Sequence, residues 1–168
     1  MKAMETDRLI IRELNLFDAK FILTLLNEKS FIKNIGDKQV RTLADAEKYL
    51  LEGPMASYKK HGFGLLHIAL KETFEPVGMC GILKRDEFEL PDLGYALLPK
   101  FWRKGYAKET CEFLLNYSKN TLKIQEISAV TSPENLASNN LLAFLGFKQL
   151  STINLNDLPT FYFEKTLG

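Results

Sequence analysis

The spacing of apolar residues changes twice in the middle of the chain, and this change constrains the fold more than any other feature. Residues 63–83 contain two short apolar runs around a polar turn, which is the pattern of an antiparallel hairpin. Residues 92–98 and 125–131 are also strand-like, but a helical stripe over 105–119 separates them. A strand–helix–strand unit of this kind joins two parallel strands. The sequence therefore predicts a sheet with both antiparallel and parallel neighbours.

The segments on either side complete the expected architecture. The expected strands are 8–14, 63–70, 77–83, 92–98, 125–131, 147–154 and 160–165. The expected helices begin after the caps Asn15 and Thr42 and, further on, cover 105–119 and 136–145. Pro54 should break the second helix, and residues 30–41 read as irregular. We expect one α/β (α+β) domain over 1–168, with a mixed, mostly antiparallel sheet of about seven strands flanked by helices on both faces.

Charge and composition argue against several classes of function. The chain has 22 Lys and Arg against 21 Asp and Glu, so its net charge of +1 predicts neither nucleic-acid nor membrane binding. Residues 1–8 are too charged for a signal peptide, so we expect a cytoplasmic protein. Cys80 and Cys111 form no CxxC pair and the chain has only 2 His, so we expect no metal site and two reduced core thiols. The sequence leaves the choice between monomer and homodimer open.

A basic loop before the third helix is the most informative segment. A strand ends at Pro99, and a helix begins at or near Gly105. The first turn of a helix presents unpaired N–H groups and the positive end of the helix dipole. Gly105 permits a close approach to the backbone, and Arg103 and Lys104 add positive charge. These features together suit a diphosphate, although they match neither a P-loop nor a dinucleotide fingerprint.

The segment 132–147 is the second informative stretch. Ser132 or Asn135 can cap the helix that follows, and Leu145-Gly146-Phe147 is a typical helix end with an apolar contact. Taken alone, this segment indicates only an ordinary helix.

Together, the two stretches resemble the GNAT superfamily of N-acetyltransferases. Within it, the chain resembles the RimJ/RimL-like branch, which is named for the enzymes that acetylate the N-termini of ribosomal proteins. The resemblance covers nearly the whole chain and rests, in order, on Glu5–Arg12, Pro76–Gly78, Asp92–Tyr95, Phe101–Glu109 and Asn135–Phe147. It implies that acetyl-CoA is the acyl donor. It also implies that the strands at 92–98 and 125–131 splay apart, with a bulge in the first, to admit this donor.

The resemblance assigns donor-binding roles residue by residue. The backbone N–H groups that would hold the diphosphate belong to Arg103, Lys104, Gly105, Tyr106 and Ala107. The main-chain groups that would pair with the pantetheine arm belong to Ala96, Leu97 and Leu98. Asn135 would bind a pantetheine amide, and Ser138 would lie near the thioester. Trp102 stands where many relatives carry Gln or Arg, so we expect less side-chain help to the phosphates.

The catalytic candidates are Ser138, Asp92 and Tyr95. Leu142 occupies the place where many relatives carry a Tyr general acid, so Ser138 becomes the candidate proton donor to the leaving sulfur. Asp92 is the candidate base or amine anchor, in a position where the branch often has Glu. Strict alternation places Tyr95 and Asp92 on opposite faces of their strand.

The acceptor decides how strong a base is needed. A peptide α-amine has a pKa of about 7.7–8.0 and a lysine amine about 10.4, so the α-amine tolerates a weak or water-relayed base. We therefore expect an N-acetyltransferase for a peptide or protein N-terminal α-amine, acting by direct attack through a tetrahedral intermediate. The alternatives are an acetyltransferase for a small amine, such as an aminoglycoside or polyamine, and a non-catalytic CoA-binding sensor. By analogy with the family, Glu47, Glu52 and residues 31–40 are candidates for the acceptor wall.

Overall fold

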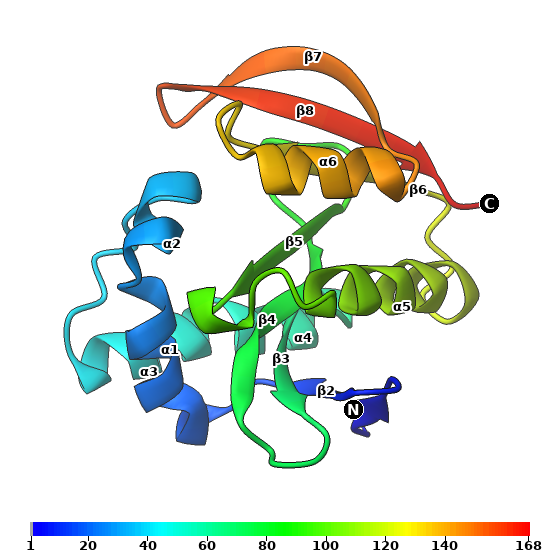
Figure 1. The fold of residues 1–168 in the computed structure, drawn as a ribbon. Helices are drawn as coiled ribbons and strands as arrows, with labels where there is room; N and C mark the ends of the chain where they lie inside the picture. Colours follow the sequence, from blue (N-terminus) through cyan, green and yellow to red (C-terminus); the bar gives the residue numbers. More distant parts are fainter. Residues whose placement is uncertain (1) are drawn as a thin grey trace.

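The computed structural model describes residues 2–168 and contains one sheet of eight strands with helices on both faces (Figure 1). The strands are β1 (Met4–Glu5), β2 (Leu9–Glu13), β3 (Leu65–Leu70), β4 (Pro76–Leu83), β5 (Asp92–Leu97), β6 (Glu126–Thr131), β7 (Lys148–Leu155) and β8 (Leu158–Thr166). Their order in the sheet is β1-β2-β3-β4-β5-β6-β8-β7. All neighbours are antiparallel except β5 and β6, so the expected mixed sheet is confirmed.

Within residues 2–168, six α-helices and two short 3₁₀ turns connect the strands. The helices are α1 (Ala19–Leu26), α2 (Lys29–Asn34), α3 (Leu43–Glu52), α4 (Pro54–His61), α5 (Tyr106–Asn120) and α6 (Leu136–Phe144), and the turns are η1 (Leu16–Asp18) and η2 (Pro99–Phe101). The helix-start signals are confirmed, since Asn15 and Thr42 each form a capping box with the residue three positions later. The expected break falls at Gly53, directly before Pro54. No helix between residues 2 and 168 is long and apolar enough to span a bilayer.

One expectation about elements is wrong, and one short strand was not expected. Residues 30–41 are not wholly irregular, because α2 forms a short helix there with Phe31 buried against the core. The sheet of about seven strands is confirmed, and the additional short strand is the two-residue β1, which pairs with β2. Both elements are short and carry little apolar periodicity, which explains why the pattern missed them.

The core is divided between the two faces of the sheet. One cluster packs α5 and α6 onto the strands and includes both buried thiols, Cys80 and Cys111, which are free as expected. The other packs α1 to α3 onto the opposite face around Leu65 and Met79. A site at the middle of the sheet can therefore be reached by side chains from both helical layers.

Candidate active site

The parallel pair β5–β6 joins at one point and then separates. Asp92 and Ser128 are the only residues of the two strands that the structure pairs, and the Ser128 N–H donates to the Pro91 carbonyl at 2.9 Å. On its other side, β5 pairs with β4 along all six residues without a shift of register. The splay expected from the family is therefore present, while the expected bulge in β5 is absent.

The separation leaves part of the β5 backbone facing a gap. In an antiparallel pair, the N–H and C=O of one residue point to the same side and alternate along the strand. Leu98 donates its N–H to Val77 at 2.9 Å and Ala96 has the same orientation, so both residues face β4. Of the three residues expected to pair with the pantetheine arm, only Leu97 directs its backbone groups away from β4 and toward the gap. Its carbonyl already accepts the Trp102 indole N–H at 3.0 Å.

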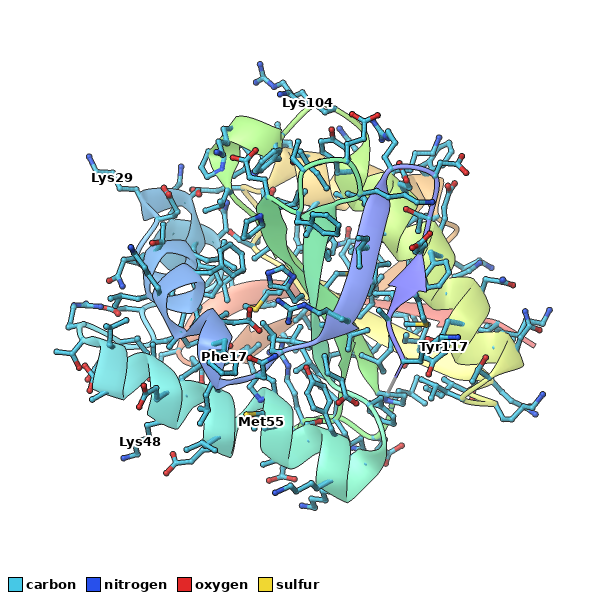
Figure 2. The ribbon with its side chains drawn as sticks, turned by 90° about the horizontal axis from the view of Figure 1, so that it is seen from below. Phe17, Lys29, Lys48, Met55, Lys104 and Tyr117 are labelled. Carbon is cyan, nitrogen blue, oxygen red and sulfur yellow. The ribbon has the colours of Figure 1, made fainter. Side chains whose placement is uncertain are left out.

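The loop beyond β5 presents free amides at the start of α5. Gly105 has a φ of +82° and caps the helix without a side-chain hydrogen bond, and the first helical bond runs from the Glu109 N–H to the Gly105 carbonyl at 3.0 Å. The N–H groups before Glu109, which include those of Tyr106 and Ala107, thus lack helical partners. Arg103 and Lys104 are exposed, and Figure 2 shows Lys104 directed into solvent. These groups fit the diphosphate of acetyl-CoA.

Arg8 and Thr6, in the N-terminal segment, hold this loop and the first turn of α5 through a set of contacts that we call the clamp. Sequence reasoning did not find these contacts. Arg8 donates from Nη1 to the Lys104 carbonyl at 2.8 Å and from Nε to Glu109 Oε2 at 2.7 Å. Its guanidinium also lies 4.3 Å from the centre of the Tyr106 ring. Thr6 and the Arg8 N–H bind the other oxygen of Glu109, at 2.6 and 2.9 Å. The only sequence signal was that Arg8 and Glu109 both fall in segments that resemble the family.

Asn135 and Ser138 lie together at the start of α6. The Asn135 side-chain oxygen accepts the Ser138 N–H at 3.2 Å, so the Asn135 amide nitrogen stays available to a ligand. The Tyr95 hydroxyl is buried with no partner within hydrogen-bonding distance. Burial raises the pKa of Tyr95, and nearby Ser138 opposes that rise. Tyr95 and Ser138 therefore approach each other on the α5–α6 side of β5.

Asp92 lies on the other face of β5, as alternation predicts. Its side chain is 0% exposed, and Oδ2 lies 3.2 Å from Arg85 Nη2, yet neither oxygen accepts a well-formed hydrogen bond. Burial raises the pKa of Asp92 to about 6 although Arg85 opposes this. Because both oxygens are covered, an amine could exchange a proton with Asp92 only through water or after Arg85 moves.

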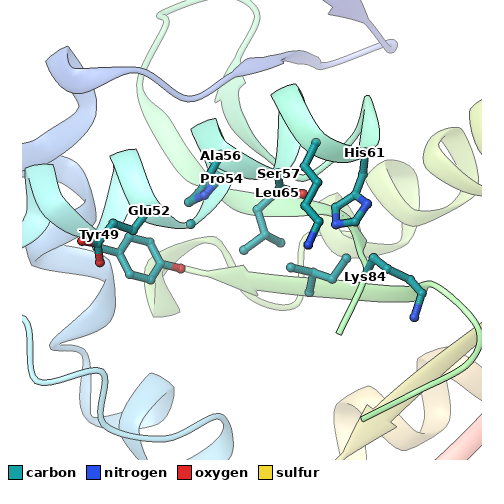
Figure 3. A pocket seen from close by; sticks show the side chains of 11 residues that line it. Tyr49, Glu52, Pro54, Ala56, Ser57, His61, Leu65 and Lys84 are labelled. Carbon is teal, nitrogen blue, oxygen red and sulfur yellow. The ribbon is translucent and has the colours of Figure 1, made fainter. Parts of the chain in front are cut away.

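The remaining candidates divide between core and acceptor side. Leu142 is 1% exposed and belongs to the core. Glu52 lines a cavity of about 280 Å³ between the α3–α4 turn and the strands β3 and β4, whereas Glu47 does not line it (Figure 3). The cavity is on the face of Asp92, because Leu83 lines it and is the β4 partner of Asp92.

Comparisons with known proteins agree with this architecture. Residues 8–148 match the domain family described as "Acetyltransferase (GNAT) domain". The uncharacterized N-acetyltransferase YoaA of Bacillus subtilis is 26% identical over 148 residues, covering 87% of this chain and 82% of YoaA. An acetyltransferase from Agrobacterium tumefaciens has a TM-score of 0.84 at 22% identity, covering 98% of this chain and 94% of that one.

A further solved structure includes the acyl donor. Microcin C7 self-immunity acetyltransferase MccE, in complex with acetyl-CoA and AMP, has a TM-score of 0.81 at 18% identity, covering 96% of this chain and 93% of MccE. The family match spans most of the chain and includes the splayed strands and the amide-rich loop. The chain therefore belongs to the GNAT acetyltransferase family and is an acetyl-CoA-dependent acyltransferase.

Proposed function

We propose that the protein acetylates the N-terminal α-amine of a peptide or protein, as the RimJ/RimL-like branch does. The free amides of Arg103 to Ala107 bind the diphosphate of acetyl-CoA. Leu97 and Asn135 bind the pantetheine arm along the gap beside β5. This placement brings the thioester to the middle of the sheet, between Asp92 on one face and Ser138 on the other.

The transfer needs one proton removed and one supplied. The α-ammonium group loses one proton through water to Asp92, and the neutral amine nitrogen then attacks the thioester carbonyl carbon to form a tetrahedral intermediate. The C–S bond then breaks, and the sulfur takes a proton from the Ser138 hydroxyl. Ser138 regains a proton from the nitrogen of the collapsing intermediate, and the proton on Asp92 passes to solvent. The products are an N-acetyl amide and free CoA thiol.

The environment of Asp92 is the observation that supports an α-amine acceptor. A carboxylate with a pKa of about 6 is a weak base. Taking a proton from an α-amine of pKa about 7.8 costs about 2.5 kcal/mol, whereas taking one from a lysine amine costs about 6 kcal/mol. The α-amine is therefore the easier acceptor by roughly 3.5 kcal/mol.

Solved structures of similar fold do not decide the acceptor. They include a ribosomal-protein-S5-alanine acetyltransferase from Vibrio fischeri, with a TM-score of 0.74 at 17% identity. They also include a spermidine N-acetyltransferase chimera, with a TM-score of 0.78 at 15% identity. At such identities the likeness concerns the fold alone, so the choice of acceptor rests on the site.

Thiol release from acetyl-CoA tests the proposal. We expect release with short peptides that have a free α-amine, and little with N-blocked peptides that carry a lysine or with spermidine. Ser138→Ala should lower kcat by about 10–100-fold with little change in the Kd of acetyl-CoA, because general acid catalysis is lost while the donor site remains. Ser151→Ala, on the exposed strand β7, is the matched control.

Two results count against this function, and a third counts against the role of Ser138 alone. Faster turnover of spermidine than of peptides would make the protein a small-amine acetyltransferase. Acetyl-CoA binding without turnover of any amine would make it a sensor. An unchanged kcat in Ser138→Ala removes Ser138 from the mechanism.

A further inference from the structure

Lys108 and Phe144 join the helices α5 and α6 at the surface of the protein. The Lys108 ammonium nitrogen lies 4.1 Å from the centre of the Phe144 ring, which is a cation–π contact. Lys108 belongs to the first turn of α5, and Phe144 is the last residue of α6. Figure 1 shows the two helices beside each other, each following one strand of the splayed pair.

Both side chains are accessible to a ligand. The Phe144 side chain is 63% exposed, although Phe is among the residues most often buried. Lys108 is exposed as well, and within residues 2–168 its ammonium forms no ion pair and no hydrogen bond. The adjacent Glu109 does not neutralise it, because Thr6 and Arg8 bind the Glu109 carboxylate. The Lys108 ammonium therefore keeps three N–H donors for another partner.

This pair lies next to the amides that are proposed to hold the diphosphate. Lys108 directly follows Ala107, whose N–H belongs to that set, and both residues are in the same helical turn. In CoA, the ribose that is esterified to the diphosphate carries both the adenine and the 3′-phosphate. With the diphosphate at the start of α5, this end of the molecule is within reach of the two side chains.

We propose that Phe144 and Lys108 form the subsite for the adenosine 3′-phosphate end of CoA. The adenine stacks on the exposed Phe144 ring, as bases do on aromatic side chains in general. The Lys108 ammonium binds the 3′-phosphate through a charge-assisted hydrogen bond. This inference rests on the donor site of the proposed function, and it is independent of which amine receives the acetyl group.

The other aromatic rings near the loop suit this role less well. The Tyr106 ring already contacts the Arg8 guanidinium, and Phe101 is buried. Trp102 is 44% exposed, but in the described part of the chain no cation lies over its ring, and its indole N–H is bound to a backbone carbonyl. Phe144 is thus the exposed ring that has an unpaired cation beside it.

Equilibrium binding of CoA and of dephospho-CoA, which lacks only the 3′-phosphate, tests the proposal without any acceptor amine. Isothermal titration calorimetry gives the Kd of each ligand. We expect CoA to bind about fivefold more tightly at low ionic strength, because an exposed charge pair has a modest effect. The preference should shrink at about 0.3 M salt, since such a pair is screened.

Substitutions of Lys108 test the phosphate contact. Lys108→Gln should bring the ratio of the two Kd values near one, because the ammonium is lost while the helix remains. The matched control is Lys119→Gln, which changes an exposed lysine in the last turn of the same helix. This control should keep the ratio of the unmodified protein.

Substitutions of Phe144 test the stacking contact. Phe144→Leu should raise both Kd values about tenfold and leave their ratio unchanged, because the adenine is common to the two ligands. Phe144→Tyr keeps an aromatic ring and should bind both ligands as the unmodified protein does. Phe17→Leu, which removes a 98% exposed ring on η1, is the matched control and should leave both Kd values unchanged.

The outcomes distinguish the subsite from the donor site as a whole. Equal Kd values for CoA and dephospho-CoA, or a preference that survives in Lys108→Gln, overturns the subsite. Unchanged Kd values in Phe144→Leu overturn it too. Failure of the unmodified protein to bind either ligand instead overturns the donor site of the proposed function. Because the ratio is taken within one variant, a loss of folded protein does not change it.

Discussion

Asp92 and His67 are two buried titratable groups whose effects on stability run in opposite directions. His67 is nearly inaccessible, and burial lowers its pKa to about 4 from the usual 6.5. The unfolded chain therefore binds more protons at this residue between pH 4 and 6.5, and its contribution to stability is lost as the pH falls. Asp92 has its pKa raised from 3.8 to about 6, so between those values the folded chain binds more protons and stability rises as the pH falls.

A substitution at Asp92 should make the contribution of His67 to the pH dependence of stability measurable. Each shift corresponds to about 3 kcal/mol, so in the unmodified protein the two contributions largely offset each other between pH 4 and 6. We expect Asp92→Asn to be up to about 3 kcal/mol more stable at pH 7 and to lose about 3 kcal/mol between pH 6.5 and 4. Urea unfolding across this range measures both values. A pH dependence equal to that of the unmodified protein would falsify the ionisation states assigned here.

The same substitution bears on catalysis. If Asp92 accepts the amine proton, Asp92→Asn should lower kcat/KM and remove the rise of activity centred near pH 6. The second rise of kcat/KM with pH, which reflects deprotonation of the amine itself near pH 7.8, should remain. A pH–rate profile with a peptide acceptor distinguishes the two limbs, and survival of the lower limb would point to another base.

At the scale of elements, the donor loop depends on contacts with Arg8, the residue directly before β2. Arg8→Ala removes two hydrogen bonds that hold the loop and the first turn of α5, those to Lys104 and Glu109. The loop must then be ordered by acetyl-CoA itself, so we expect the KM for acetyl-CoA to rise about tenfold, with a smaller change in kcat. Steady-state kinetics with acetyl-CoA as the varied substrate measures this.

Lys29→Ala on α2, whose side chain is exposed in Figure 2, is the matched control and should leave both constants unchanged. A fall in kcat with an unchanged KM would show that the clamp serves the chemistry rather than donor binding.

The elements themselves were largely predictable from local pattern. The helix starts at Asn15 and Thr42 and the stop at Gly146 were confirmed because capping chemistry is local. Contacts between distant segments were not predictable in this way. Trp102 was expected to give less help to the phosphates, but its bond to the Leu97 carbonyl depends on how η2 folds back over β5. Nothing in the local pattern joins Arg8 to Glu109, 101 residues away.

At the scale of the molecule, the donor should stabilise the fold measurably. A ligand at 100 times its Kd adds about 2.7 kcal/mol to the stability of the folded state, which raises Tm by roughly 5–10 °C for a chain of this size. We expect that shift with acetyl-CoA and almost none with acetyl-pantetheine at the same concentration, because acetyl-pantetheine lacks the diphosphate. Thermal unfolding followed by fluorescence tests the pair. Equal shifts would mean that the loop does not bind the diphosphate.

The overall topology was predictable only in outline. The hairpin and the strand–helix–strand unit predicted a mixed sheet, and the family resemblance placed its gap between 92–98 and 125–131. The position of β8 between β6 and β7 could not be predicted, because several strand orders bury the same apolar faces.

The contact between Arg8 and Glu109 also sets an order of events during synthesis. Arg8 leaves the ribosome 101 residues before its partner Glu109. Contacts of such long sequence separation form late and slow the folding of a nascent chain. A chain that has not yet extended to Glu109 therefore lacks the contact that orders the donor loop, and we expect full affinity for CoA only once this contact has formed.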